Sequence, residues 1–147
     1  MSSHTVSCQW LREKIFLLHD RAAFPLVMTQ PGGINGSDLL PLSLAGCLAW
    51  DLQSILAKQR QQLTGLTVTA ESEQDDVPPW RFRRIRLTYR LSGPGLDEAA
   101  ARRAVQLSET KYCSIYATLK DAVEITTSIV INHQLLDHAD DQQNSES

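Results

Sequence analysis

One long apolar helical segment, residues 38 to about 62, constrains the fold of this chain more than any other feature. Its apolar residues recur three or four positions apart, which is the spacing of one face of an α-helix. They are Leu42, Ala45, Ala49, Leu52 and Leu56. About 25 residues is long for a domain of this size, because helices average about 11 or 12 residues. We therefore predict that this segment is the central helix, enclosed on more than one side.

The helix has a clear predicted start. Residues 30–37 combine proline, glycine, asparagine and serine, which is typical of a loop. The loop ends at Ser37 and Asp38, which we predict to be the helix N-cap.

The rest of the sequence predicts strands before and after the central helix, and a second helical region. Three β-prone segments near the start predict an antiparallel meander, with residues 19–21 in a turn. After the central helix, two segments alternate apolar and polar residues, as half-buried strands do. A helical stretch, a break at Lys111 and Tyr112, a short helix and a final strand follow. The predicted ranges are 5–10, 13–18, 24–29, 66–71, 82–91, 97–109, 113–119 and 122–132.

This order of elements predicts the fold class. Strands and helices do not alternate one for one, so we expect an α+β fold with antiparallel sheets. We expect one domain over residues 1–136 and a disordered, acidic tail over residues 137–147. A three-stranded sheet cannot cover the apolar surface of the central helix, so we expect a homodimer that shares one core.

Charge and hydropathy restrict the partners. The formal net charge is -3, which argues against nucleic acid, because phosphate binding needs a basic face. Arg12, Glu13 and Lys14 lie within the first twenty residues, so we expect no secretory signal. No apolar run approaches the roughly 20 residues of a membrane span. We therefore expect a cytoplasmic protein without a membrane partner.

Three arginines of segment 82–91 share one face, which predicts a solvated sheet face or, as an alternative, a site for an acidic partner.

The three cysteines, Cys8, Cys47 and Cys113, are far apart in the sequence. Reducing thiol pools keep structural pairs open in the cytoplasm, so no disulfide framework is expected. No zinc-type spacing surrounds any of them, and the four histidines are scattered, so we predict no metal site and no cofactor. Any single free cysteine is more often a small core residue than a reactive one. Cys8 has only a strand pattern around it, and we expect it to be a core or an edge residue.

The other two cysteines have more informative surroundings. Cys47 lies within the central helix, with Ser43 one turn before it and Asp51 one turn after it. Cys113 follows the helix break and starts a helical stretch, where backbone N–H groups and the helix dipole favour a thiolate. On electrostatics alone, Cys113 is the more acidic thiol. The pair is interpreted either as core residues or as the working thiols of a redox enzyme.

The sequence resembles the OsmC/Ohr family, the osmotically inducible protein C and organic hydroperoxide resistance proteins. The resemblance runs from about Gly32 to Ile131. Its most specific part is Gly-Gly-Ile-Asn-Gly-Ser-Asp-Leu-Leu-Pro-Leu-Ser-Leu-Ala-Gly-Cys, which ends at Cys47. The stretch from Asp51 to Arg60 follows, and then Lys-Tyr-Cys-Ser-Ile around Cys113. The last motif is closer to the general OsmC-like branch than to the organic hydroperoxide branch.

The resemblance implies an intertwined α+β homodimer with sheets around long central helices, and thiol-dependent reduction of organic hydroperoxides. Cys47 would attack the peroxide and Cys113 would resolve the product as a disulfide. An external dithiol of the lipoyl type would restore both thiols. The family's helix-opening glutamate falls on Asp38, and its arginine on Arg21, with Arg12 as the alternative. The competing hypothesis is a catalytically silent dimer that binds a small apolar ligand.

Overall fold

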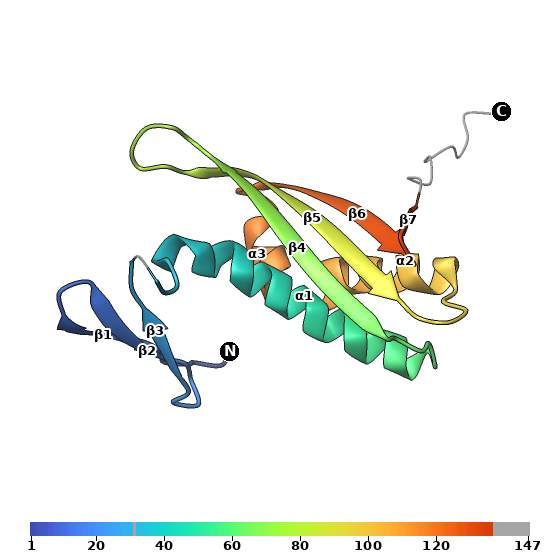
Figure 1. The fold of residues 1–147 in the computed structure, drawn as a ribbon, viewed down its shortest axis with the longest axis horizontal. Helices are drawn as coiled ribbons and strands as arrows, with labels where there is room; N and C mark the ends of the chain where they lie inside the picture. The colour runs from blue at the N-terminus through green and yellow to red at the C-terminus, as the bar shows by residue number, and fades with distance from the viewer. Residues whose placement is uncertain (31, 137–147) are drawn as a thin grey trace. The chain divides into compact units, whose positions relative to one another are not determined.

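A computed structural model describes residues 1–30 and 32–136. The chain forms two compact units, Met1–Leu40 and Pro41–Ser147, and its elements are labelled in Figure 1. Strands and helices are present without one-for-one alternation, so the predicted α+β class is confirmed. The single domain over residues 1–136 stays a prediction. The predicted tail, residues 137–147, lies outside the described residues.

The first unit contains a three-stranded antiparallel sheet. Its strands are β1 (Ser7–Arg12), β2 (Ile15–His19) and β3 (Pro25–Met28), in the order β1-β2-β3. This confirms the predicted meander. The turn between β2 and β3 is held by the carboxylate of Asp20, which accepts the N–H groups of Ala22 at 2.8 Å and Phe24 at 2.9 Å. Such side-chain to backbone bonds are typical of aspartate in turns.

The central helix α1 (Leu39–Lys58) follows a short 3₁₀ turn, η1 (Gly36–Asp38). The predicted cap at Ser37 and Asp38 is wrong, because Asn35 caps η1 and its Oδ1 accepts the Ser37 N–H at 3.2 Å. The helix also ends earlier than predicted. Arg60 has a left-handed φ of 57°, and the Gln61 N–H donates to the carbonyl of Leu56 at 3.0 Å. A left-handed residue with a backward bond is a common helix C-cap.

The buried face of α1 is formed by leucines at strict four-residue spacing. Leu44, Leu48, Leu52 and Leu56 are fully buried. The predicted stripe was therefore right at Leu52 and Leu56 and wrong at Leu42, which is 54% exposed. The buried face of α1 could not be identified from the sequence, because this helix is apolar on all sides and its hydrophobic periodicity is weak.

The same helix meets the length and composition of a membrane span. The segment Gly36–Lys58 has 23 residues, and an 18-residue window within it has a mean hydropathy of 1.4. The expectation that no apolar run approaches a membrane-spanning length was therefore wrong. Length and composition are weak indications, because the central helix of a water-soluble core has both. The four fully buried leucines of α1 belong to the hydrophobic core of the second unit, and 22% of the window is buried.

The second unit contains a four-stranded sheet in the order β4-β5-β6-β7. Its strands are β4 (Gly65–Gln74), β5 (Phe82–Ser92), β6 (Glu124–Ile131) and β7 (Gln134–Leu135). Neighbours β4 and β5 form an antiparallel hairpin, but β5 and β6 are parallel. The prediction of purely antiparallel sheets was therefore wrong. A parallel pair needs a long crossover connection, and here helices supply it.

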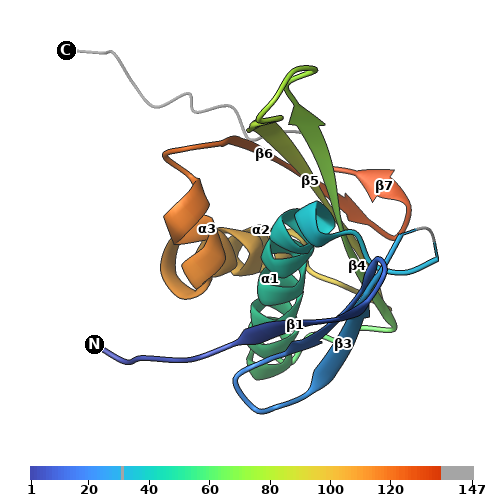
Figure 2. The ribbon, with the colours of Figure 1, turned by 90° about the vertical axis from the view of Figure 1, so that its left-hand side faces the viewer.

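The crossover from β5 to β6 contains three helical segments. They are α2 (Glu98–Leu107), the π-helical turn η2 (Ser108–Tyr112) and α3 (Ser114–Leu119). Asp97 caps α2, because its carboxylate accepts the Ala99 N–H at 3.1 Å. The break predicted at Lys111 and Tyr112 falls in η2. In Figures 1 and 2, α1 and α2 lie on the same side of this sheet.

The core of the second unit lies between this sheet and its helices. From β5, the inward-facing residues are the four predicted ones, Ile85, Leu87, Tyr89 and Leu91, all at most 1% exposed. They pack with the α1 leucines and with Ala101, Ala104 and Val105 of α2. Small alanines on α2 allow the helix to approach its neighbours closely.

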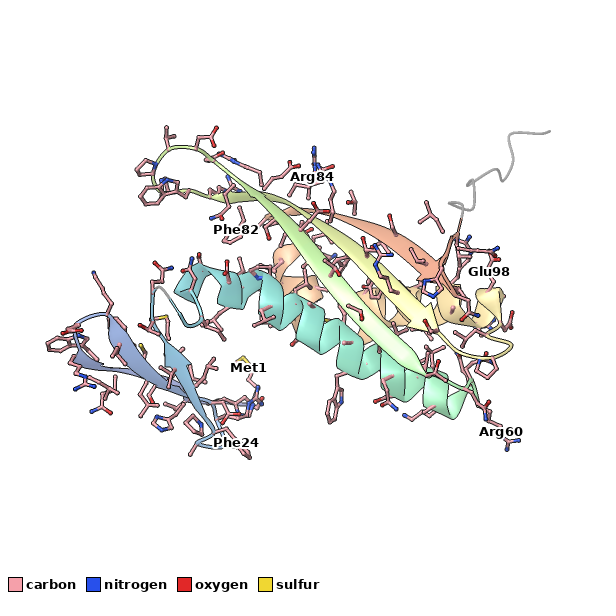
Figure 3. The ribbon with its side chains drawn as sticks, viewed as in Figure 1. Met1, Phe24, Arg60, Phe82, Arg84 and Glu98 are labelled. Atoms are coloured by element: carbon pink, nitrogen blue, oxygen red, sulfur yellow. The ribbon has the colours of Figure 1, made fainter. Side chains whose placement is uncertain are left out.

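The outer face of the sheet carries charged pairs. Arg84 contacts Glu73 at 3.3 Å and Glu124 at 3.0 Å, and Arg86 also pairs with Glu73. Arg84 extends to the side of the sheet away from α1 (Figure 3). These side chains are well exposed, so each pair contributes about 0 to 1 kcal/mol to stability. The predicted solvated sheet face is confirmed.

Candidate functional site

The second unit brings two thiols and a carboxylate together. The sulfur atoms of Cys47 and Cys113 and a carboxylate oxygen of Asp51 all lie within 4.8 Å of one another. Cys47 and Asp51 are one turn apart on α1, so they share a helix face. Cys113 comes from the start of α3. The cluster therefore joins two elements that the sequence separates widely.

Local structure fixes the position of Cys113. Its φ of -79° and ψ of 107° are extended, and it is the N-cap of α3. Its Sγ accepts a hydrogen bond from the Tyr116 N–H at 3.3 Å. This geometry confirms the predicted helix start. A sulfur in this position satisfies one of the N–H groups that every helix leaves unpaired at its start.

The expected acidity of Cys113 is wrong. The residue is only 2% exposed, and burial, together with hydrogen bonding to Cys47, raises the pKa of the Cys113 thiol to about 12. The backbone N–H groups of Tyr116 and Ile115 oppose this rise but do not overcome it. Removing the thiolate from water therefore outweighs the helix start. The Cys113 thiol is therefore protonated at physiological pH.

Cys47 is the more accessible thiol. It is half-buried, whereas Cys113 is buried. The Cys113 sulfur lies within 4.8 Å of the Cys47 sulfur, so a protonated Cys113 can direct its S–H toward Cys47. Such a donor stabilises a negative charge on Cys47.

Asp51 is the unsatisfied member of the cluster. Its Oδ2 is buried and has no hydrogen-bond partner among the described residues. Burial raises the pKa of the Asp51 carboxyl. An unpaired buried acceptor costs about 1 to 3 kcal/mol, so this oxygen is the part of the site that most needs a proton or another partner.

A second polar cluster, which the sequence did not reveal, adjoins the thiols. The hydroxyls of Tyr89 and Thr127 donate to Glu109 Oε1 at 2.8 Å and 2.5 Å. Desolvation raises the pKa of Glu109 although both bonds oppose the rise. The pKa of Tyr89 is also raised, first by desolvation and then by Glu109 and its neighbours, Cys113 among them. Alternation in β5 predicted that Tyr89 faces inward, but no sequence signal named its partner.

The other predicted residues lie in the first unit. Arg21 is exposed in the turn after β2, and Arg12 is exposed on β1. Asp38 is exposed in η1, directly before α1. Cys8 is exposed on β1, an edge strand of its sheet, so of the two predicted placements, core or edge, the edge placement is confirmed. The structure thus brings Cys47 and Cys113 together within one unit, and the roles of Asp38 and Arg21 stay predictions.

Comparison with known proteins identifies the class of this chain. The family model described as OsmC-like protein matches residues 29–128, which include both cysteines of the cluster. The chain belongs to the OsmC-like protein family, and the resemblance seen in the sequence is confirmed. The family's α+β fold is the one described above.

The chain is also similar to individual known proteins. Protein YhfA of Escherichia coli (strain K12) is 33% identical over 123 residues, covering 82% of this chain and 92% of YhfA. A crystal structure of a hypothetical protein from Aquifex aeolicus VF5 has a TM-score of 0.81 and 26% identity, covering 89% of this chain and 97% of the other. An organic hydroperoxide resistance protein OsmC from Legionella pneumophila, described as a predicted redox protein, has a TM-score of 0.64 and 15% identity, covering 88% of this chain and 98% of the other. The last similarity shows the fold alone.

Proposed function

We propose that this protein is a thiol-dependent peroxidase that reduces organic hydroperoxides to alcohols. The observation that carries the proposal is the pair of sulfur atoms, Cys47 and Cys113, within 4.8 Å of each other in one unit. A disulfide needs an S–S distance of about 2.05 Å, so the two sulfur atoms have to move closer together for it to form. Membership of the OsmC-like family supports the redox assignment.

The proposed first step consumes the peroxide. The Cys47 thiolate attacks the peroxide oxygen that carries hydrogen, and the O–O bond breaks. The alkoxide leaves and takes up a proton to become the alcohol, while Cys47 becomes a sulfenic acid. Cys113 supports this step as a neutral hydrogen-bond donor to the thiolate. Asp51, the nearest carboxylate in the cluster, is the acceptor that we assign to the proton of Cys47.

The proposed second step closes the disulfide. The sulfur of Cys113 attacks the Cys47 sulfenic sulfur, and hydroxide leaves as water with the proton of Cys113. Two thiols and one hydroperoxide thus give one disulfide, one alcohol and one water. An external dithiol, which we propose to be of the lipoyl type, then reduces the disulfide by exchange. No metal or nucleotide is needed for these steps.

The assignment of the other site residues follows the family. We propose that Asp38 and Arg21 orient and activate the Cys47 thiolate, with Arg12 as the alternative arginine. Replacing each arginine by alanine in turn tests the choice. The true partner should lower kcat/KM roughly tenfold to a hundredfold, because a positioned cation stabilises the thiolate. If both variants kept wild-type activity, neither arginine would take part in the mechanism.

We also propose that the working form is a cytoplasmic homodimer. Support comes from α1, which leaves Leu42 54% exposed and Trp50 77% exposed within one chain. Large apolar side chains exposed together are typical of an interface. Light scattering should give twice the monomer mass of 16.4 kDa. A monomer at micromolar concentration would contradict the shared core.

Turnover of an organic hydroperoxide by purified protein with dithiothreitol tests the proposed function. Wild type and Cys8→Ser should consume cumene hydroperoxide at the same rate, since the proposed steps use only the thiols of Cys47 and Cys113. Cys47→Ser should be inactive. Cys113→Ser should lose steady turnover with dithiothreitol but still react once with peroxide. Wild-type activity no higher than that of Cys47→Ser would favour the catalytically silent dimer that binds a small apolar ligand.

A further inference from the structure

The cluster of Cys47, Asp51 and Cys113 has the donor set of a metal site, although the sequence predicted none. We propose that the reduced form of this cluster binds one thiophilic divalent cation, of which Zn²⁺ fits best, and that this binding competes with disulfide formation. Zinc is bound in proteins by thiolate, imidazole and carboxylate groups. Magnesium and calcium prefer oxygen ligands throughout, so two sulfur donors exclude them.

The distances in the cluster suit a cation. Tetrahedral zinc with Zn–S bonds of about 2.3 Å holds two sulfur atoms about 3.8 Å apart. The three donor atoms of the site already lie within 4.8 Å of one another. Reaching that geometry therefore needs a smaller movement than closing the disulfide does. Three protein donors leave the fourth position for water or a small ligand.

Asp51 supplies an independent reason for the site. Its Oδ2 is buried and has no hydrogen-bond partner in the described part of the chain. Burial of an unpaired carboxylate oxygen is unfavourable, and coordination to a cation removes the penalty. Asp51 and Cys47 are also four residues apart on α1, the spacing that places two metal ligands on one helix face. Without a cation or a proton, nothing in the described structure explains this oxygen.

The third ligand is held in place by its own helix. Cys113 Sγ accepts the Tyr116 N–H at 3.3 Å, and such a bond orients a ligand atom and stabilises its negative charge. Cys113 and Cys47 thus approach the site from different elements, α3 and α1. The three donors form a preformed cluster on two elements of one unit.

Binding transfers protons and no electrons. Zn²⁺ is redox-inert, and both thiols release their protons as they become thiolate ligands. The bound thiolates are then withheld from hydroperoxide until the cation leaves. This inhibition rests on the proposed peroxidase function, whereas the binding of the cation does not.

Calorimetric titration with Zn²⁺ tests the site directly. The protein is reduced, freed from reductant without air, and titrated with the metal alone. We expect one Zn²⁺ per chain for wild type and for the control Cys8→Ser. We expect a loss of binding in Cys47→Ser and Cys113→Ser, and affinity at least roughly tenfold weaker in Asp51→Asn. Co²⁺ should give thiolate-to-metal charge-transfer absorption in the same variants that bind Zn²⁺.

Oxidised wild-type protein provides a control that needs no substitution. Its Cys47–Cys113 disulfide should abolish binding, and re-reduction should restore it. Binding that persists after oxidation or in Cys47→Ser would show an adventitious ion only and would overturn the proposal. The absence of binding in the reduced wild type would also overturn it.

Peroxidase assays of the same samples separate the two proposals. Zinc binding without peroxidase activity supports the site and contradicts the function, and activity without zinc binding does the reverse.

Discussion

The second unit contains two half-buried carboxylates, Glu109 and Asp51, and they differ in their hydrogen bonds. Glu109 accepts hydrogen bonds from Tyr89 and Thr127, whereas Asp51 Oδ2 has no partner among the residues described. Buried polar groups with hydrogen-bond partners stabilise one packing of a core, whereas a buried polar group without a partner is typical of a functional site. From this comparison we propose that the Glu109 cluster contributes to stability and that the Asp51 cluster contributes to the chemistry.

The largest expected effect separates the two clusters by activity. Cys47→Ser should lower hydroperoxide reduction at least roughly a hundredfold, because the nucleophile is lost. Tyr89→Phe, in the Glu109 cluster, should retain activity within about threefold, because it removes only a hydroxyl outside the thiol site. Initial rates with cumene hydroperoxide measure both. A comparable loss in Tyr89→Phe would place the Glu109 cluster in the reaction.

The next effect separates them by stability. Tyr89→Phe removes one of the two hydrogen bonds to Glu109 and should lower the free energy of unfolding by about 1 to 3 kcal/mol. Asp51→Asn should be neutral or stabilising, because it removes a charge that has no partner. Urea unfolding at neutral pH compares the two. Destabilisation of Asp51→Asn by as much as Tyr89→Phe would show that Asp51 is paired in solution.

The smallest expected effect is a pH dependence that belongs to Glu109. Desolvation raises the pKa of Glu109 above its ordinary value of 4.5, so the folded state binds the proton more tightly than the unfolded state. Stability should therefore be greatest below 4.5 and fall as pH rises through the folded pKa. Unfolding free energies measured across this range should slope less in Glu109→Gln. An unchanged slope would assign the dependence to another carboxyl, and Asp51, whose pKa is also raised, is the next to test.

Much of the fold could be predicted from local patterns. The strands of the first unit, the inward residues of β5 and the break before Cys113 all follow from alternation and turn chemistry, which are local. The parallel pairing of β5 with β6 could not be predicted, because pairing depends on the path of a crossover rather than on the pattern of either strand. The buried face of α1 was only half correct, since an apolar helix has little periodicity to read.

The site could be predicted only in part, for a related reason. The resemblance to the family gave the pairing of Cys47 with Cys113, but sequence alone gave the wrong acidity for Cys113. The helix start is visible in the sequence, whereas the burial that raises the pKa to about 12 depends on tertiary packing. The proximity of Asp51 to both sulfur atoms could not be predicted either. The three residues are close in space, but their spacing in the sequence matches no metal-binding motif.

The account depends most on Cys47 and Cys113 acting as one redox pair, and peptide mapping measures this directly. Reduced protein is treated with one equivalent of cumene hydroperoxide, blocked with an alkylating reagent, digested and analysed by mass spectrometry. We predict a disulfide between the peptides of Cys47 and Cys113, with Cys8 alkylated. In Cys113→Ser, a sulfenic-acid reagent should label Cys47. Only Cys8-linked or overoxidised products in wild type, or sulfenic label at Cys113 in Cys47→Ser, would contradict the assignment.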